Sequence, residues 1–153
     1  MILEAVRAAR WSRRVNTVFL EWLDPLMAAG HWIPQMAALA GTYDLLTRPG
    51  YPSRAVTWEQ VVAAKPEGLV LMPCGFDVPR TLKEAAPLTQ RAEWAELPAV
   101  QAGNVWAVNA NSYFSRPGPR LVDGLEMLAE MFHPELFTTQ RPVGAQTAVR
   151  MRL

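Results

Sequence analysis

The chain is poor in cysteine and lacks any long uncharged apolar run. Cys74 is the single cysteine among 153 residues, so an intrachain disulfide cannot form. No uncharged apolar segment approaches the ~18 residues that a membrane-spanning helix needs. The first residues contain no apolar stretch followed by a small-residue cleavage site, so we expect no secretory signal peptide in this chain.

An excess of charge of one sign is also missing. The 15 basic and 14 acidic side chains give a formal net charge of +1. This balance provides no electrostatic basis for binding nucleic acid or an anionic membrane surface. Glycine-rich dinucleotide and phosphate loops and the Gly-x-Ser-x-Gly nucleophile motif are absent as well. We therefore expect neither an enzyme nor a bound cofactor or metal.

What is present is apolar material, proline and tryptophan. Half of the residues are hydrophobic, and the length suits one ordinary domain with a proper core. The 13 prolines predict many short elements separated by fixed turns. The six tryptophans indicate either a rich core or an aromatic ligand surface.

Strand and helix patterns alternate along the chain. Strands are predicted at 17–23, 69–72 and 104–109, with a short edge strand at 43–46. Helices are predicted at 32–40, 58–64, 79–90 and 119–132, with Thr57 as an N-cap and Gly41 after a helix end. This alternation predicts an α/β fold: a single three-layer αβα lobe over 15–137 with a mostly parallel sheet. Residues 1–14 read as the end of a helix, and 138–153 as a tail without a period.

Ligands of such folds sit beyond the carboxyl ends of the strands. Here these ends are the segments 22–30, 73–77 and 109–117, which are rich in glycine, proline and aromatic residues. We expect Trp58 and Phe132 in the core. An accessible aromatic rim would suit a large flat or macrocyclic ligand. Five aromatic side chains fall at loops off the core stripes: Trp22, Tyr51, Phe76, Tyr113 and Phe114.

A rival hypothesis is a metal- or thiol-dependent enzyme that uses His31, Cys74 and Asp24. A closed structural metal site needs four ligands, and two that lie far apart in sequence are weak support. A solvated loop histidine and an incidental thiol are the favoured interpretations of His31 and Cys74. Glu21 and Asp24 could act as an acid/base pair only if they converge on a substrate. A third hypothesis is an interaction module that dimerises through its exposed rim.

Three runs carry a family resemblance: 19–34, 71–77 and 111–125. In order and spacing they resemble periplasmic cobalamin-binding proteins, which are substrate-binding proteins of ABC importers for corrinoids, siderophores and haem. The resemblance covers residues 15–137. It implies the C-terminal lobe of a two-lobed receptor, preceded by part of the inter-lobe helix and lacking the N-terminal lobe. It also implies a periplasmic or extracellular location and an ABC permease as partner.

The resemblance assigns individual residues to the ligand cleft. Tyr51-Pro52 matches an aromatic–proline pair whose ring lies against the corrin, and Tyr113-Phe114 matches an aromatic pair at the cleft floor. Ser115 stands where the family has an acidic residue that pairs with permease arginines. The hypothesis is a lobe that captures cobalamin or a related corrinoid without covalent chemistry, with a siderophore or haem as the alternative ligand. Its predicted ligand-binding residues are Trp22, Asp24, His31, Tyr51, Phe76, Tyr113, Phe114 and Arg116, of which Asp24 and Arg116 would orient the amide fringe.

Two physical expectations follow from a single lobe. Half a cleft supplies half of the contacts, so this chain should bind a corrinoid weakly or not measurably. The open cleft face and the apolar stripe at Leu3, Val6 and Ala9 lack part of their packing. We therefore expect a homodimer that buries at least ~1,000 Å².

Overall fold

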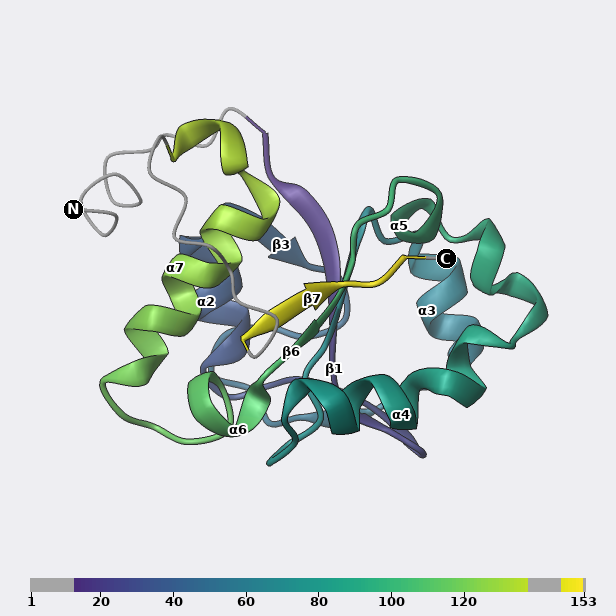
Figure 1. Ribbon diagram of the computed structural model, residues 1–153, viewed down its shortest axis with the longest axis horizontal. Helices are drawn as coiled ribbons and strands as arrows, with labels where there is room; N and C mark the ends of the chain where they lie inside the picture. The colour runs from purple at the N-terminus through teal and green to yellow at the C-terminus, as the bar shows by residue number, and fades with distance from the viewer. Residues whose placement is uncertain (1–12, 138–146, 153) are drawn as a thin grey trace.

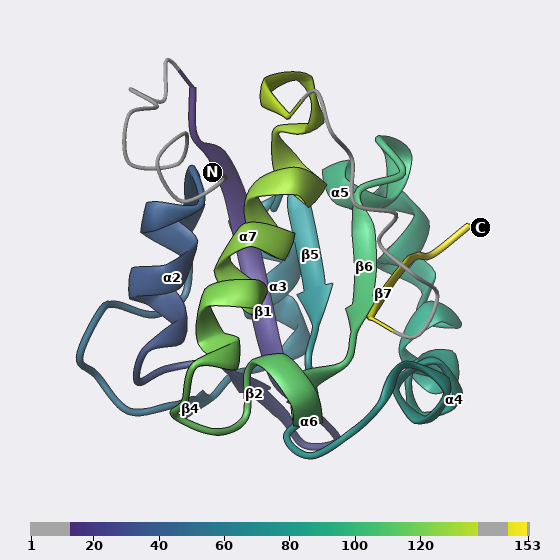
Figure 2. The same ribbon diagram turned by 60° about the vertical axis from the view of Figure 1, so that its left-hand side comes forward.

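A computed structural model describes residues 13–137 and 147–152. Its centre is a sheet that Figure 1 shows nearly edge-on. The strand order is β4-β2-β1-β5-β6-β7, as Figure 2 shows, and β3 is also paired to β1. The pairs β1–β5, β5–β6 and β1–β3 are parallel, whereas β1–β2, β2–β4 and β6–β7 are antiparallel. The strand bounds are β1 Val15–Leu23, β2 Leu26–Ala28, β3 Thr42–Asp44, β4 Arg54–Ala55, β5 Gly68–Leu71, β6 Val105–Val108 and β7 Ala148–Arg150.

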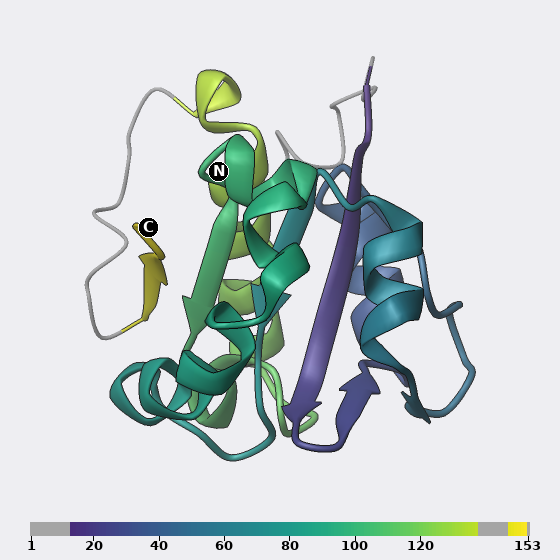
Figure 3. The same ribbon diagram turned by 90° about the vertical axis from the view of Figure 1, so that its right-hand side faces the viewer.

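Helices cover both faces of the sheet. Figures 2 and 3 show α2 (Ile33–Leu39) and α7 (Arg120–Phe132) on one face. The other face carries α3 (Trp58–Ala64), α4 (Val78–Thr89) and α5 (Pro98–Gln101). Shorter turns complete the chain: the 3-10 helices η1 (Ala92–Glu96) and η2 (Pro134–Leu136), and helix α6 (Ala110–Tyr113). The predicted three-layer α/β fold with a mostly parallel sheet is confirmed.

The central strands are apolar on both sides because both sides are covered. Phe19 of β1 packs in the cluster that contains α2 and α7 residues. Its neighbours Val18 and Leu20 pack in the other cluster, with Trp58 of α3. Alternate side chains of a strand point to opposite faces, so a continuous apolar run is required here. As expected, Trp58 and Phe132 are buried core residues.

The predicted helix ends are also present. The Thr57 hydroxyl accepts from the Gln60 backbone N–H, while the Gln60 side chain accepts from the Thr57 N–H. This capping box satisfies two N–H groups at the start of α3. Gly41 has a positive φ of 79° directly after the end of α2, a conformation that costs glycine no Cβ clash.

Three strands depart from the sequence-based prediction. No strand was predicted between residues 23 and 43 or between 46 and 69, but these stretches contain β2 and β4. The tail was expected to lack regular structure, which is wrong for β7: Val149 pairs with Ala107 of β6. Each of these strands has at most three residues, too few to display a period of two.

The expected helix at 1–14 falls almost wholly outside the described residues. Arg13 and Arg14, which are described, are not helical. In the part of the chain that the structure describes, no helix combines the length and the apolar character needed to cross a membrane.

Candidate functional site

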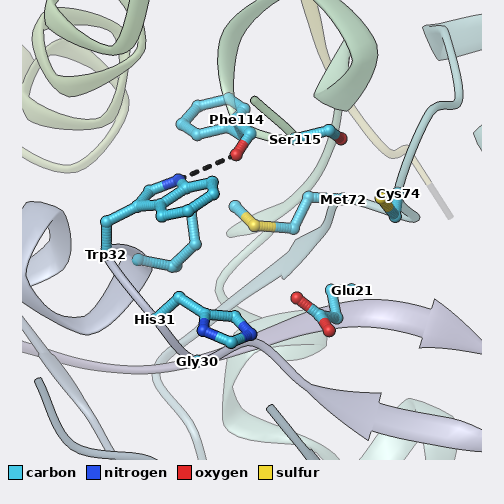
Figure 4. A pocket seen from close by; sticks show the side chains of 9 residues that line it. Glu21, Gly30, His31, Trp32, Met72, Cys74, Phe114 and Ser115 are labelled. Atoms are coloured by element: carbon cyan, nitrogen blue, oxygen red, sulfur yellow. Dashed lines mark hydrogen bonds between the residues drawn. The ribbon is translucent and has the colours of Figure 1, made fainter. Parts of the chain in front are cut away.

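A pocket of about 240 Å³ opens where β1 and β5 approach their carboxyl ends (Figure 4). Glu21 comes from β1, and Met72 and Cys74 follow β5. The wall beside α2 is built by the turn between β2 and that helix, and the remaining wall by the end of α6. The lining residues are Glu21, Gly30, His31, Trp32, Ile33, Met72, Cys74, Phe114 and Ser115.

Hydrogen bonds join the turn that contains His31 to the 50–53 loop. The His31 backbone N–H donates to the Tyr51 carbonyl at 2.7 Å, and the Gly50 N–H donates to the His31 carbonyl at 3.3 Å. The Gly30 N–H donates to Ser53 Oγ at 3.1 Å. A Cβ on Gly30 would overlap the backbone of Pro52 and Ser53, so only glycine permits this close approach.

Two hydrogen bonds hold the remaining walls in place. The indole N–H of Trp32 donates to the Phe114 carbonyl at 2.9 Å, which joins the start of α2 to the end of α6 (Figure 4). The Gly75 N–H donates to Ser115 Oγ at 3.0 Å, which joins the loop after β5 to the segment before α7. The pocket therefore has a shape set by contacts between elements distant in sequence.

The pocket lining has little charge. Among its nine residues, Glu21 is the one acid and His31 the one imidazole; the others are aromatic, aliphatic, sulfur-containing or small. Figure 4 shows the Glu21 carboxylate and the His31 ring bordering the same open space, with Met72 and Trp32 above them in this view. Within 13–137 and 147–152, no group of three or more His, Cys, Asp or Glu side chains is arranged to hold a metal ion. The arrangement suits non-covalent capture of an apolar or flat molecule.

The predicted aromatic residues divide into three groups by exposure. Tyr51 is 62% exposed, and Trp22 and Tyr113 are half-buried. Phe76 and Phe114 are buried, so the expectation of an accessible rim is wrong for these two rings. Trp22 packs edge-on against Phe76, with ring centroids 5.2 Å apart, and the Arg80 guanidinium lies 3.8 Å from the centre of the Phe76 ring. These neighbours are why Phe76 is covered.

The predicted polar site residues do not all lie at the pocket. His31 lines the pocket, whereas Asp24 and Arg116 are exposed and outside its lining. The Asp24 carbonyl accepts from the Trp22 indole at 3.1 Å, which fixes the tip of the β1–β2 hairpin. For the enzyme hypothesis, the structure brings His31 and Cys74 to one pocket but does not bring Asp24 there. The ligand-binding roles of all eight predicted residues stay predictions.

Sequence reasoning missed four residues of the pocket wall: Gly30, Trp32, Ile33 and Met72. Met72 reads as the end of a buried strand, and its side chain is indeed buried while also facing the pocket. Trp32 reads as the first residue of a helix. The one available signal was position, because Gly30 and Trp32 flank His31 in a strand-end segment.

A second pocket of about 450 Å³ lies beside α2 and β3. Its lining includes Arg14, Tyr43, Asp44 and Arg48. Burial raises the pKa of Asp44, although the N–H groups of Leu46 and Thr47 and the Thr47 hydroxyl all donate to its carboxylate. These bonds fold the 44–47 turn, so Asp44 has a structural role there.

Curated relatives match about two thirds of this chain. Vitamin B12-binding proteins from three strains of Vibrio cholerae are each 31% identical to it over 102 residues, which is 67% of this chain. The same match covers 34% of each relative, so the chain spans about a third of their length. No established family model matches the chain.

Solved structures share its fold. A TroA-like periplasmic binding protein from Veillonella parvula has a TM-score of 0.75 at 16% identity over 99% of this chain and 52% of its own. A periplasmic haem-binding protein from Pseudomonas aeruginosa has a TM-score of 0.69 at 20% identity, over 99% of this chain and 53% of its own. The periplasmic vitamin B12-binding protein of Vibrio cholerae has a TM-score of 0.62 at 20% identity, over 85% of this chain and 47% of its own. The chain thus has the fold of a TroA-like periplasmic binding protein lobe and is similar in sequence to vitamin B12-binding proteins of Vibrio cholerae.

Proposed function

We propose that this chain is the C-terminal lobe of a substrate-binding protein that captures cobalamin or a related corrinoid for an ABC importer. The observation that carries the proposal is the preformed, weakly charged pocket at the carboxyl ends of β1 and β5. It occurs in a chain whose curated relatives are named vitamin B12-binding proteins. A corrin is broad and mostly apolar at its faces, so aromatic and aliphatic walls with few charges suit it.

The pocket supplies part of a binding face. Its volume of about 240 Å³ is smaller than the ~300–1,000 Å³ typical of small-molecule sites, so a large macrocycle would rest on it. Exposed Tyr51, whose carbonyl holds the His31 turn, extends this face beyond the pocket. The half-buried Trp22 and Tyr113 would add further aromatic surface at its border.

Isothermal titration calorimetry with cyanocobalamin tests the proposal. We expect a dissociation constant above about 1 μM, because one lobe supplies part of the contacts while the ligand loses its full translational freedom. Tyr51→Ala should weaken binding by about two- to tenfold, from the loss of roughly 0.5–1.5 kcal/mol of aromatic contact. Tyr43→Ala is the matched control, because Tyr43 is equally exposed and lines the other pocket. Absence of binding at millimolar ligand, or sensitivity to Tyr43→Ala alone, would contradict the proposal.

Haem is the second candidate ligand. Structures of periplasmic haem-binding proteins match 89% and 99% of this chain, with TM-scores of 0.65 and 0.69. Haem presents the same kind of flat, largely apolar face as a corrin. Parallel titration with iron(III) protoporphyrin would rank the two ligands directly.

Location and partners belong to the same proposal. The matched relatives include periplasmic binding proteins, and we propose a periplasmic or extracellular location and an ABC permease as partner. Ser115, which stands at the expected position of an acidic docking residue, instead accepts a hydrogen bond from Gly75. The homodimer stays a prediction, and Leu3, Val6 and Ala9, which would carry part of it, lie outside the described residues.

A further inference from the structure

His31 has a left-handed backbone conformation, which is uncommon for a residue with a side chain. Its φ is 56°, and among the described residues Lys65 is the other non-glycine residue with positive φ. Lys65 is the C-cap of α3, where the left-handed conformation is common. His31 lies before α2 and ends no helix. A side chain in this conformation costs roughly 1–2 kcal/mol, and glycine would avoid that cost.

The surrounding bonds maintain this conformation and aim the ring. Both backbone polar groups of His31 are bonded to the 50–51 segment, and the preceding Gly30 is bonded to Ser53. The imidazole lies beside the Trp32 indole, with ring centroids 5.9 Å apart, and borders the open space of the pocket (Figure 4). A strained residue held by its surroundings at a pocket indicates that its side chain has a role there.

The chemistry around His31 limits what that role is. No set of three potential metal ligands exists among the described residues, so this pocket is not built to hold a bare metal ion. A single imidazole suffices, however, when a macrocycle already supplies four ligands and leaves an axial position open. We propose that the His31 imidazole supplies an axial ligand to the metal of a macrocycle that lies over this pocket; this inference rests on the proposed function. An imidazole nitrogen lone pair would replace a metal-bound water, and the oxidation state of the metal would not change.

Aquocobalamin and cyanocobalamin provide the test, because they have nearly the same shape but aquocobalamin alone has an exchangeable water. The exposed Cys74 thiol lines the same pocket and could compete for the cobalt, so all proteins carry Cys74→Ser. The test variant is His31→Asn, because asparagine tolerates positive φ and the variant should fold. His133 remains in every protein, so adventitious coordination by another histidine would persist.

We expect the protein with Cys74→Ser alone to bind aquocobalamin at least about tenfold more tightly than cyanocobalamin, with a shift of the visible absorption bands of the cobalamin. His31→Asn should abolish the absorption shift and reduce the ratio of the two affinities to about one, and this ratio is the readout whatever change the variant makes to cyanocobalamin affinity. Iron(III) protoporphyrin against metal-free protoporphyrin gives the same comparison for porphyrins. Equal affinities within both ligand pairs, or a shift that survives His31→Asn, would overturn the role of His31 and leave the proposed function standing. Failure of all four compounds to bind would overturn both.

Discussion

At the residue scale, Gly30 determines how closely the two loops of the site approach. A Cβ at this position meets backbone atoms of Pro52 and Ser53, which cannot rotate away as a side chain could. We expect Gly30→Ala to lower the free energy of unfolding by about 1–3 kcal/mol through overpacking. Chemical denaturation measures this change. Gly118→Ala is the control, because a Cβ there meets nothing within 4 Å, and it should change stability by less than about 0.5 kcal/mol.

Glu93 is a second residue with a measurable consequence. The hydrogen bond from its own backbone N–H, and then that from the Trp58 indole at 3.1 Å, lower the pKa of Glu93. A carboxyl pKa that is lower in the folded state stabilises the fold at pH values above the unfolded-state pKa of about 4.3. This stability is lost as the pH falls through the folded-state pKa. We therefore expect the stability difference between the parent and Glu93→Gln to shrink as the pH falls from about 6 to 3.

Urea unfolding midpoints at several pH values measure this difference. Glu96→Gln removes a negative charge from the same 3-10 helix and is the control for net charge. The raised pKa of Asp44 makes its contribution to stability increase as the pH falls, which is the opposite of the Glu93 effect. Asp44 is present in both the parent and Glu93→Gln, so its contribution cancels in the comparison. A difference that stays constant down to pH 3 would refute this role of Glu93.

At the element scale, α3 depends on its capping box. Thr57 and Gln60 satisfy each other's backbone N–H groups at the start of a helix of seven residues, which has little stability of its own. We expect Thr57→Ala to lower the free energy of unfolding by about 1 kcal/mol. Gln35→Ala, at an exposed position inside α2, should lie within about 0.5 kcal/mol of the parent in the same measurement. Equal losses from both changes would contradict the capping argument.

Elements with strong local signals could be predicted from the sequence, and those formed by pairing alone could not. The run at 69–72 is apolar on every residue, and Thr57 precedes a helical pattern, so β5 and α3 were predictable. By contrast, β2, β4 and β7 are defined by their hydrogen-bonded neighbours in the sheet. The same distinction applies to the residues of the site. His31 stands out by its position after a strand-end glycine, but Met72 joins the pocket through tertiary packing.

At the scale of the whole molecule, one surface concentrates the features that the proposed function needs. The segments at the carboxyl ends of β1 and β5 and the turn at 30–33 line the pocket there, and the 50–53 loop holds that turn by hydrogen bonds. The opposite layer, with the stacked Trp58 and Trp94 at 6.2 Å between centroids, is instead packed as core. A ligand that binds through the proposed site should therefore affect one end of the sheet and leave the α3–η1 region unchanged.

The most direct test of the proposed site is an amide chemical-shift map of the ¹⁵N-labelled chain titrated with cyanocobalamin. We expect dose-dependent shifts that cluster at Glu21, the 30–33 turn, the 50–53 loop, Cys74 and Ser115, with no comparable change around Trp58 and Trp94. Shifts that cluster at α3 and η1 or at the second pocket, or no shifts at millimolar ligand, would contradict it.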